Sequence, residues 1–359
     1  MSLASRASRQ DDDRPRKTKK SKSPRWARLC LIIGIVVVVL AGGGWVAANQ
    51  VINHYADEVH KSDILGGVPQ NERASVPPSG APVTGPLNIL MLGSDNADGS
   101  RAKTQGVDGQ RSDSIILFHI DKSFQHVYAF SIERDSYVRI PAGGSWQGGK
   151  DKINAALQYG GPSLTLRTVQ DLLGIKINYA AVVSFSALIK AVDAVGGVDV
   201  NVDKTTYDNQ FKRTWTKGIH HLTGMDAEYY VRQRHGLAAG DYDRMKRQQQ
   251  VIRALVAKAT TGGVLSNPYK LNALLETVIG SVTVETTTPV KDLVFASRSL
   301  GLGAVTFSTM PMNGTIQMGG TDYERVSSTG VEALGKAINS DDFTAYLKKY
   351  PPNDASHGL

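Results

Sequence analysis

The chain has 359 residues, 41% hydrophobic and 21% charged, a composition typical of globular proteins with enough apolar material for one large core. Ten lysines and arginines and three aspartates lie within residues 1–28, so this segment carries seven of the eight formal positive charges. The rest of the chain is nearly neutral, which argues against a nucleic-acid-binding domain and against nucleic acid as a partner.

A charge-free segment, residues 29–48, follows the basic one. As a helix its twenty residues span about 30 Å, roughly the thickness of the bilayer hydrocarbon. We therefore predict a basic cytoplasmic tail over 1–28, a single transmembrane helix over 29–48, and an extracellular remainder, because the positive excess precedes the span. A cleaved signal peptide is the alternative, which the small residues Ala47 and Ala48 keep open, although its apolar region is usually only about 7–15 residues long.

Residues 49–86 are predicted to form a juxtamembrane segment and a stalk, since 66–86 is rich in proline, glycine and serine. The apolar patterning that begins at Leu87 continues to about residue 350. We predict one folded extracellular domain over 87–350 and a short C-terminal tail over 351–359.

Short apolar runs alternate with helical patterns in this domain. Strands are predicted at 87–93, 114–120, 126–132, 179–185 and 198–202, and helices at 162–173, 186–195 and 241–260. The continuous apolar runs indicate strands buried on both faces. Strands interleaved with helices predict an α/β fold, a three-layer α-β-α domain with a central mixed sheet.

Two carboxylates and an arginine lie at turns that flank the first two predicted strands. Asp95 follows the strand at 87–93, and Arg111 and Asp113 precede the strand at 114–120. Ligand sites in open α/β sheets gather at strand ends, and oxygen ligands suit Mg²⁺. Aspartates also commonly cap turns, so a purely structural role for both remains the alternative at this point.

Arginines also lie in two further segments, before the predicted helix at 241–260. Arg134 follows the third strand, and Arg232 and Arg234 would share one face if residues 229–235 were extended. Buried arginines converge only around an anion, and their planar forks suit phosphate oxygens. An Arg134–Asp135 surface pair is the alternative for the first of these places.

The predicted helix at 241–260 begins with a cationic face. Arg244 and Gln248 lie four apart and share this face, with Arg247 close by. Such a face fits a phosphate ligand, and the alternative is attraction to acidic lipid headgroups.

Seven stretches, taken together, resemble the LytR–CpsA–Psr family of Gram-positive bacterial envelopes. They are NILMLGSD (88–95), RSDSIILFHID (111–121), SIERDSYVRIP (131–141), KINAALQYGG (152–161), VDAVGGVDV (192–200), HLTGMDAEYYVRQRH (221–235) and GDYDRMKRQQQVI (240–252). They fall in order over most of 87–260. The predicted anchor, stalk and domain also fit this family.

The resemblance implies a phosphotransferase that moves a glycopolymer from a polyprenyl pyrophosphate carrier onto peptidoglycan, leaving a phosphodiester. It implies Mg²⁺ (or Mn²⁺) held by Asp95 and Asp113. The pyrophosphate-binding residues carried over are Arg111, Arg134, Lys152, Arg232, Arg234, Arg244, Arg247 and Gln248, with Asn154 nearby. The catalytic set carried over is Asp113, Arg111, Arg134, Arg232 and Arg234. Teichoic-type polymers and arabinogalactan are both donors that fit the resemblance.

Three alternatives accompany this interpretation. The prenyl tail would need an apolar groove, for which 164–189 and 251–256 are candidates, but a packed core explains the same residues. The family usually has proline where this chain has Glu133, and this carboxylate could pair with Arg134 or face solvent. A non-catalytic, membrane-tethered protein that presents lipid-linked polymer is the alternative function.

The predicted topology is testable with a reporter phosphatase that is active only outside the cytoplasm. Fused after Leu359, it should be active and should sediment with membranes, because the basic tail stays inside and residues 29–48 stay in the bilayer. Active reporter released into the medium would indicate a cleaved signal peptide. An inactive reporter would contradict the topology and favour an intracellular role such as transcriptional regulation.

Overall fold

The computed structural model of the chain describes residues 60–61, 67–75, 82–94, 112–261, 282–285 and 305–353. The predicted basic tail and transmembrane span lie outside these residues. No helix in these described ranges is both long and apolar enough to cross a membrane.

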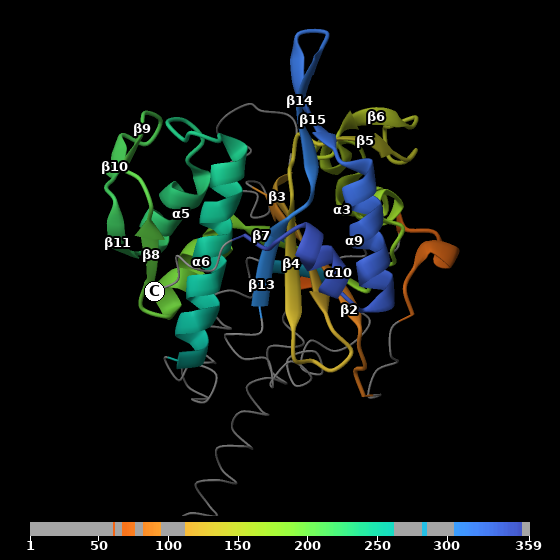
Figure 1. The fold of residues 1–359 in the computed structure, drawn as a ribbon, viewed down its shortest axis with the longest axis horizontal. Helices are drawn as coiled ribbons and strands as arrows, with labels where there is room; N and C mark the ends of the chain where they lie inside the picture. The colour runs from red at the N-terminus through yellow and green to blue at the C-terminus, as the bar shows by residue number, and fades with distance from the viewer. Residues whose placement is uncertain are drawn as a thin grey trace, which may run out of the picture. The chain divides into compact units, whose positions relative to one another are not determined.

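A seven-stranded mixed sheet forms the centre of the fold (Figure 1). Its order is β1 (His60–Lys61), β12 (Val282–Glu285), β7 (Tyr179–Ser184), β2 (Leu87–Ser94), β3 (Ser112–Ile120), β4 (Val127–Ile132) and β13 (Val305–Thr309). β3 is antiparallel to both β2 and β4, whereas β7 is parallel to β2 and β13 is parallel to β4. The predicted mixed sheet and its first four predicted strands are confirmed.

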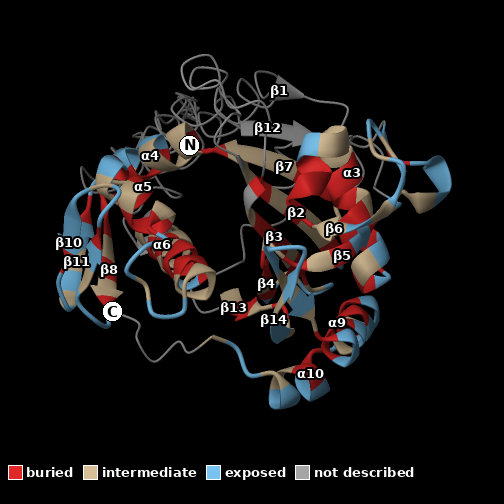
Figure 2. Ribbon diagram, turned by 90° about the horizontal axis from the view of Figure 1, so that it is seen from above, coloured by how far each residue is buried: buried red, intermediate tan, exposed pale blue. Residues whose placement is uncertain are grey.

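Helices lie on both sides of this sheet (Figure 2). One side carries α3 (Ala155–Leu173), α9 (Ser328–Ser340) and α10 (Thr344–Lys349), and the other carries α4 (Phe185–Ala194), α5 (Gly224–Arg232) and α6 (Asp241–Thr261). Leu90 and Leu117 belong to the main core with α3 and α9, whereas Ile116 packs with Phe307 and with Ile252 of α6. Alternate strand residues therefore meet helices on opposite faces, which explains the continuous apolar runs.

Four antiparallel strand pairs complete the described fold. They are β5 (Tyr137–Ile140) with β6 (Gly149–Lys152), β8 (Val198–Val202) with β11 (Gly218–Leu222), β9 (Thr206–Asp208) with β10 (Arg213–Trp215), and β14 (Met312–Met318) with β15 (Thr321–Val326). A bridge between Ser136 and Glu324 joins the turn after β4 to β15. This bridge places β15 beside the arginine-bearing turn at residues 133–135.

The helix predicted at 162–173 is the second part of α3. Gly160 and Gly161 have non-helical backbone angles, and Pro162 begins the regular segment that follows. Proline suits a first helical turn because its fixed φ matches the helix and its missing N–H is not needed there. The helix ends at Gly174, whose φ of 64° is the left-handed conformation common after a helix.

The expectation that residues 229–235 are extended is wrong for most of that segment, because α5 runs from Gly224 to Arg232. Thr223 caps this helix, since its Oγ1 accepts a hydrogen bond from the Asp226 N–H at 3.3 Å. Threonine followed three residues later by an acidic residue is a capping pattern that the sequence displays. Arg232 therefore ends a helix, and Arg234 follows its C-cap.

Part of the predicted stalk packs on the domain. Val68 is 1% exposed and belongs to the main core, and Glu72 in the short 3-10 helix η2 (Gln70–Glu72) pairs with Arg167 of α3 at 3.0 Å. The folded unit therefore begins before Leu87, because a buried apolar side chain and an ion pair attach residues 67–75 to α3.

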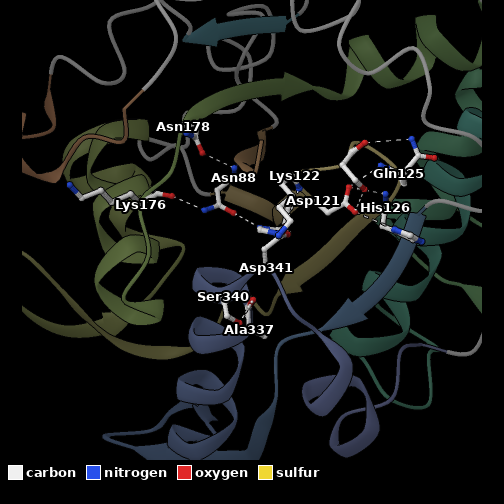
Figure 3. A network of polar contacts seen from close by, with 12 residues as sticks. Asn88, Asp121, Lys122, Gln125, His126, Lys176, Asn178, Ala337, Ser340 and Asp341 are labelled. Atoms are coloured by element: carbon white, nitrogen blue, oxygen red, sulfur yellow. Dashed lines mark hydrogen bonds and ion pairs between the residues drawn. The ribbon is translucent and has the colours of Figure 1, made fainter. Parts of the chain in front are cut away.

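A polar network closes one edge of the sheet, where β2 begins and β3 ends (Figure 3). His119 is fully buried; its Nδ1 lies 2.8 Å from Asn88 Oδ1 and its Nε2 lies 2.9 Å from Asp341 Oδ1. Asp341 Oδ2 also accepts from the Lys122 N–H at 3.1 Å. These contacts attach the end of α9 to β2 and β3.

Close packing of α9 on α3 makes Gly335 intolerant of a side chain. A Cβ there would lie 2.0 Å from the Leu173 carbonyl oxygen. Alanine normally stabilises a helix by about 1 kcal/mol relative to glycine, but Gly335→Ala should lower the free energy of unfolding by about 1–3 kcal/mol. The free energy of unfolding of this variant can be measured by denaturant titration. Lys336→Ala, at an exposed position of the same helix, should stay within about 0.5 kcal/mol, and equal stability of both variants would contradict the packing.

Candidate functional site

The end of β2, the start of β3 and the end of β4 meet at one end of the sheet, hereafter the sheet edge, which lies opposite to the His119 network. Ser94 at the end of β2 pairs with Ser112 at the start of β3, and Ile115 of β3 pairs with Ile132 at the end of β4. The antiparallel pairing therefore brings the turns after β2 and β4 beside the start of β3. β2, β3 and β4 are therefore neighbours in the sheet.

Of the two predicted metal ligands, the structure describes only the backbone of Asp113, which lies in β3 at this edge. Asp95 and Arg111 lie outside the described residues. The register shifts between Gly93 and Ser94, so Asp113 is the extra residue of a β-bulge. Bulges are frequent beside active sites because they interrupt the regular strand. In the chain, Asp95 directly follows Ser94 and Asp113 directly follows Ser112, and these two serines pair with each other.

Arg134 follows β4 and lies between two carboxylates. Its Nε is 3.7 Å from Asp135 Oδ2 and 3.6 Å from Asp241 Oδ1. Lys152, the last residue of β6, places its Nζ 3.1 Å from Asp135 Oδ1. Arg134 therefore pairs with Asp135, as the alternative predicted, but its side chain is only 12% exposed. The pair is not a surface one, and the two cations belong to a partly buried cluster.

Asp241 connects the other arginines to this cluster. It is the first residue of α6, and its Oδ2 accepts from Arg244 at 2.8 Å, while its Oδ1 lies 3.9 Å from Arg234 Nε. Arg244 is 3% exposed, which excludes it from a lipid-facing helix surface. The site residues that the structure brings together are Arg134, Lys152, Arg234 and Arg244, around the carboxylates of Asp135 and Asp241.

Sequence reasoning missed Asp241 as the centre of this cluster. The available signal was an aspartate directly after Gly240 at the start of a helix, three residues before Arg244, where an i,i+3 ion pair is expected. The local pair of Asp241 and Arg244 can be predicted from the sequence, but the approach of Arg134 to the same carboxylate cannot.

Glu133 is buried within the same cluster. Its side chain is 1% exposed, and its Oε2 accepts a hydrogen bond from the Asp135 N–H. Burial, together with the neighbouring Asp241 and Asp135, raises the pKa of Glu133 to about 9. The expectation that it could face solvent is wrong, and the raised pKa favours the neutral acid at neutral pH.

Two other predicted arginines have local partners on α5 and nearby elements. Arg232 donates to the buried Glu228 at 2.8 Å and lies 4.9 Å from the ring centre of Phe185. Arg247 donates to Gln233 and to Thr206, and its guanidinium lies 4.3 Å from the ring centre of Tyr230. Burial lowers the pKa of Arg247.

The remaining predicted side chains are buried nearby. Gln248 of α6 is 7% exposed, and Asn154 is 2% exposed. The Asn154 N–H donates to the Arg134 carbonyl at 3.1 Å, whereas its Oδ1 has no hydrogen-bond partner within the described structure. Asn154 thus fixes the backbone of the arginine-bearing turn.

The candidate segments for an apolar groove contribute residues to the cores. Leu164, Leu166 and Val169 belong to the main core, as the packed-core alternative predicts. A cavity of about 570 Å³ lies beside α6, but its lining includes Arg247 and Arg253, so this cavity is not the apolar groove that was predicted.

Fold and site together define an α/β protein whose sheet edge gathers arginines around carboxylates. The model of the LytR_cpsA_psr family matches residues 49–340, and the chain belongs to this family. It is 34% identical over 243 residues to the polyisoprenyl-teichoic acid–peptidoglycan teichoic acid transferase TagU of Bacillus cereus, covering 66% of this chain and 72% of the relative. The LcpA cell wall biosynthesis protein of Corynebacterium glutamicum is 28% identical over 360 residues, covering 89% and 67% respectively.

A solved structure agrees with this membership. The crystal structure of TagV from Bacillus subtilis superposes with a TM-score of 0.58 at 29% identity, covering 72% of this chain and 97% of that one. The family resemblance read from the motifs is confirmed.

The role of Asp241 in holding Arg244 is testable by unfolding. Asp241→Ala removes the carboxylate that the nearly buried Arg244 contacts at 2.8 Å, and it should lower the free energy of unfolding by about 3 kcal/mol. Lys246→Ala, at a 64% exposed position of the same helix, should change it by less than about 0.5 kcal/mol. Similar small effects for both variants would show that Asp241 is dispensable to the cluster.

Proposed function

We propose that this protein transfers a phosphate-linked glycopolymer from a polyprenyl pyrophosphate carrier to peptidoglycan during cell wall assembly. Membership of the family supports this, as does similarity to TagU, whose name specifies a polyisoprenyl-linked teichoic acid and a peptidoglycan acceptor. The predicted transmembrane helix at 29–48 would hold the three-layer domain at the outer membrane surface, where both the lipid-linked donor and the wall are present.

The observation that carries the proposal is the cationic cluster at the sheet edge. Arg134, Lys152, Arg234 and Arg244 come from three separate segments and lie around Asp135 and Asp241. Among the described side chains of the cluster, with Glu133 neutral, four cations face the two carboxylates of Asp135 and Asp241. Guanidinium forks bind phosphate oxygens bidentately, so the cluster suits a pyrophosphate. The proposed pyrophosphate-binding residues also include Arg111, Arg232, Arg247 and Gln248.

The proposed reaction is attack of an acceptor hydroxyl on the sugar-side phosphorus of the donor. A new phosphorus–oxygen bond to the acceptor forms, the pyrophosphate bond breaks, and polyprenyl phosphate leaves. The arginines position the phosphates and stabilise the charge that develops on their oxygens, which is the main source of catalysis in phosphoryl transfer. Asp113 is the proposed acceptor of the hydroxyl proton.

Asp95 and Asp113 would hold Mg²⁺ (or Mn²⁺). Their places in the chain, next to the paired Ser94 and Ser112, suit two oxygen ligands to one ion. When bound, the ion would neutralise part of the negative charge on the pyrophosphate.

Transfer can be measured with the full chain in detergent, a short-chain polyprenyl pyrophosphate glycan, a peptidoglycan oligomer and Mg²⁺. Mass spectrometry should detect a glycan–phosphate–acceptor adduct. Arg134→Ala and Asp113→Asn should each lower its rate of formation by at least about 100-fold, because they remove charge stabilisation and the proposed base.

The control for this assay is Lys246→Ala, an exposed lysine on the same helix as Arg244, which should retain the activity. Donor binding with no adduct from any of several glycans would overturn the proposal and support the non-catalytic presenting role.

A further inference from the structure

Three carboxyl groups crowd one end of the arginine cluster. Glu133, Asp135 and Asp241 act on one another electrostatically, and Glu133 is the most deeply buried of the three. A buried carboxylate is costly unless cations or hydrogen-bond donors compensate it. Within the described ranges, the Glu133 carboxyl group accepts a hydrogen bond at Oε2 from the backbone N–H of Asp135.

Two oxygen atoms in this group lack a hydrogen-bond donor within the described structure. They are Glu133 Oε1 and Asp241 Oδ1, and both are fully buried. The two side chains nevertheless lie within hydrogen-bonding reach of each other. Two ionised carboxylates would repel at this separation, whereas a single proton between them gives each oxygen a partner.

In the part of the chain that the structure describes, charged and titratable groups approach this pair from several elements. Arg134 and Asp135 lie on the same turn as Glu133, Lys152 comes from β6, and Arg234 precedes α6. Arg244 and Tyr242 come from α6, and Glu324 of β15 accepts from the Tyr242 hydroxyl at 2.9 Å. The cations pair with Asp135 and Asp241, so the carboxyl that remains for a proton is Glu133.

We propose that Glu133 is a positioning residue: it carries a proton that it shares with Asp241, and thereby holds Asp241 in place as the anion around which Arg134, Arg234 and Arg244 gather. The role rests on the proposed function, since it concerns the same phosphate site. Neutral Glu133 adds no negative charge to the cluster, while ionised Glu133 adds a carboxylate that repels both Asp241 and a phosphate ligand.

The sign of the pH effect follows from the burial of Glu133. Because burial and the two neighbouring carboxylates raise the pKa of Glu133 to about 9, the shared proton is present at neutral pH and is lost as the pH rises through that value. Affinity for a phosphate ligand should therefore fall at high pH. Glu133→Gln keeps a donor for Asp241 and an acceptor for the Asp135 N–H, but it cannot ionise.

The first measurement is infrared spectroscopy of the full chain in detergent at neutral pH. The wild-type spectrum minus the Glu133→Gln spectrum should contain the carbonyl band of a protonated carboxylic acid, and the band should disappear above about pH 9. No such band at neutral pH would overturn the proposal, whether or not the protein transfers glycopolymer.

The second measurement is calorimetric binding of inorganic pyrophosphate from pH 7 to pH 10. The ratio of the wild-type affinity to the Glu133→Gln affinity cancels the titration of the probe itself. We expect a ratio near one at pH 7 and a fall of about tenfold by pH 10, one pH unit above the pKa. A ratio that stays constant over this range would overturn the positioning role.

A third variant separates positioning from packing. Glu133→Leu fills similar volume but offers no donor to Asp241, so it should fold, by circular dichroism, and bind pyrophosphate more weakly at every pH. Equal binding by the leucine and glutamine variants would overturn the proposal. Should all three readouts behave as expected while no adduct forms in the transfer assay, the proton-sharing pair stands and the transferase function fails.

Discussion

The site depends on one electrostatic constraint, which is that guanidinium groups stay together only when an anion lies among them. Asp241 is that anion, since Arg134, Arg234 and Arg244 all approach its carboxylate. Its position at the start of α6 adds a favourable interaction with the positive end of the helix dipole. Without such a carboxylate, three partly buried cations from different segments would repel one another.

The sheet supplies the geometry for this convergence. Antiparallel pairing of β2, β3 and β4 turns the end of one strand, the start of the next and the end of the third toward the same edge. The turn at 133–135 leaves β4 at that edge, and the bridge between Ser136 and Glu324 holds it against β15. The opposite edge is occupied by the His119 network, so one end of the sheet is structural and the other is available for chemistry.

Ligand affinity and cluster stability are coupled at this edge. A phosphate would compete with Asp135 and Asp241 for the same donors, so the affinity depends on how firmly those carboxylates hold them. The Arg134 and Arg234 contacts to Asp241 are long, at 3.6 and 3.9 Å, whereas Arg244 is held at 2.8 Å. Arg244 thus anchors the cluster, and the two looser arginines are those best able to turn toward a phosphate. Protonation of Glu133 fits this balance, because it limits the number of competing anions.

Local patterns in the sequence were sufficient for four strands of the central sheet (β2, β3, β4 and β7), for β8, and for α4, α6 and the second part of α3. They were also sufficient for the mixed sheet and the family, since periodicity and motifs depend on near neighbours. They also singled out Arg134, because it follows a predicted strand, and Arg234 and Arg244, because they lie in an arginine-rich stretch. Tertiary structure alone decided that these residues share Asp241, that Arg247 stacks on Tyr230, and that Glu133 is buried beside two carboxylates. The reason is physical: ion pairing, burial and pKa depend on groups far apart in sequence, which only the packing of α6 and β15 against the turn after β4 brings together.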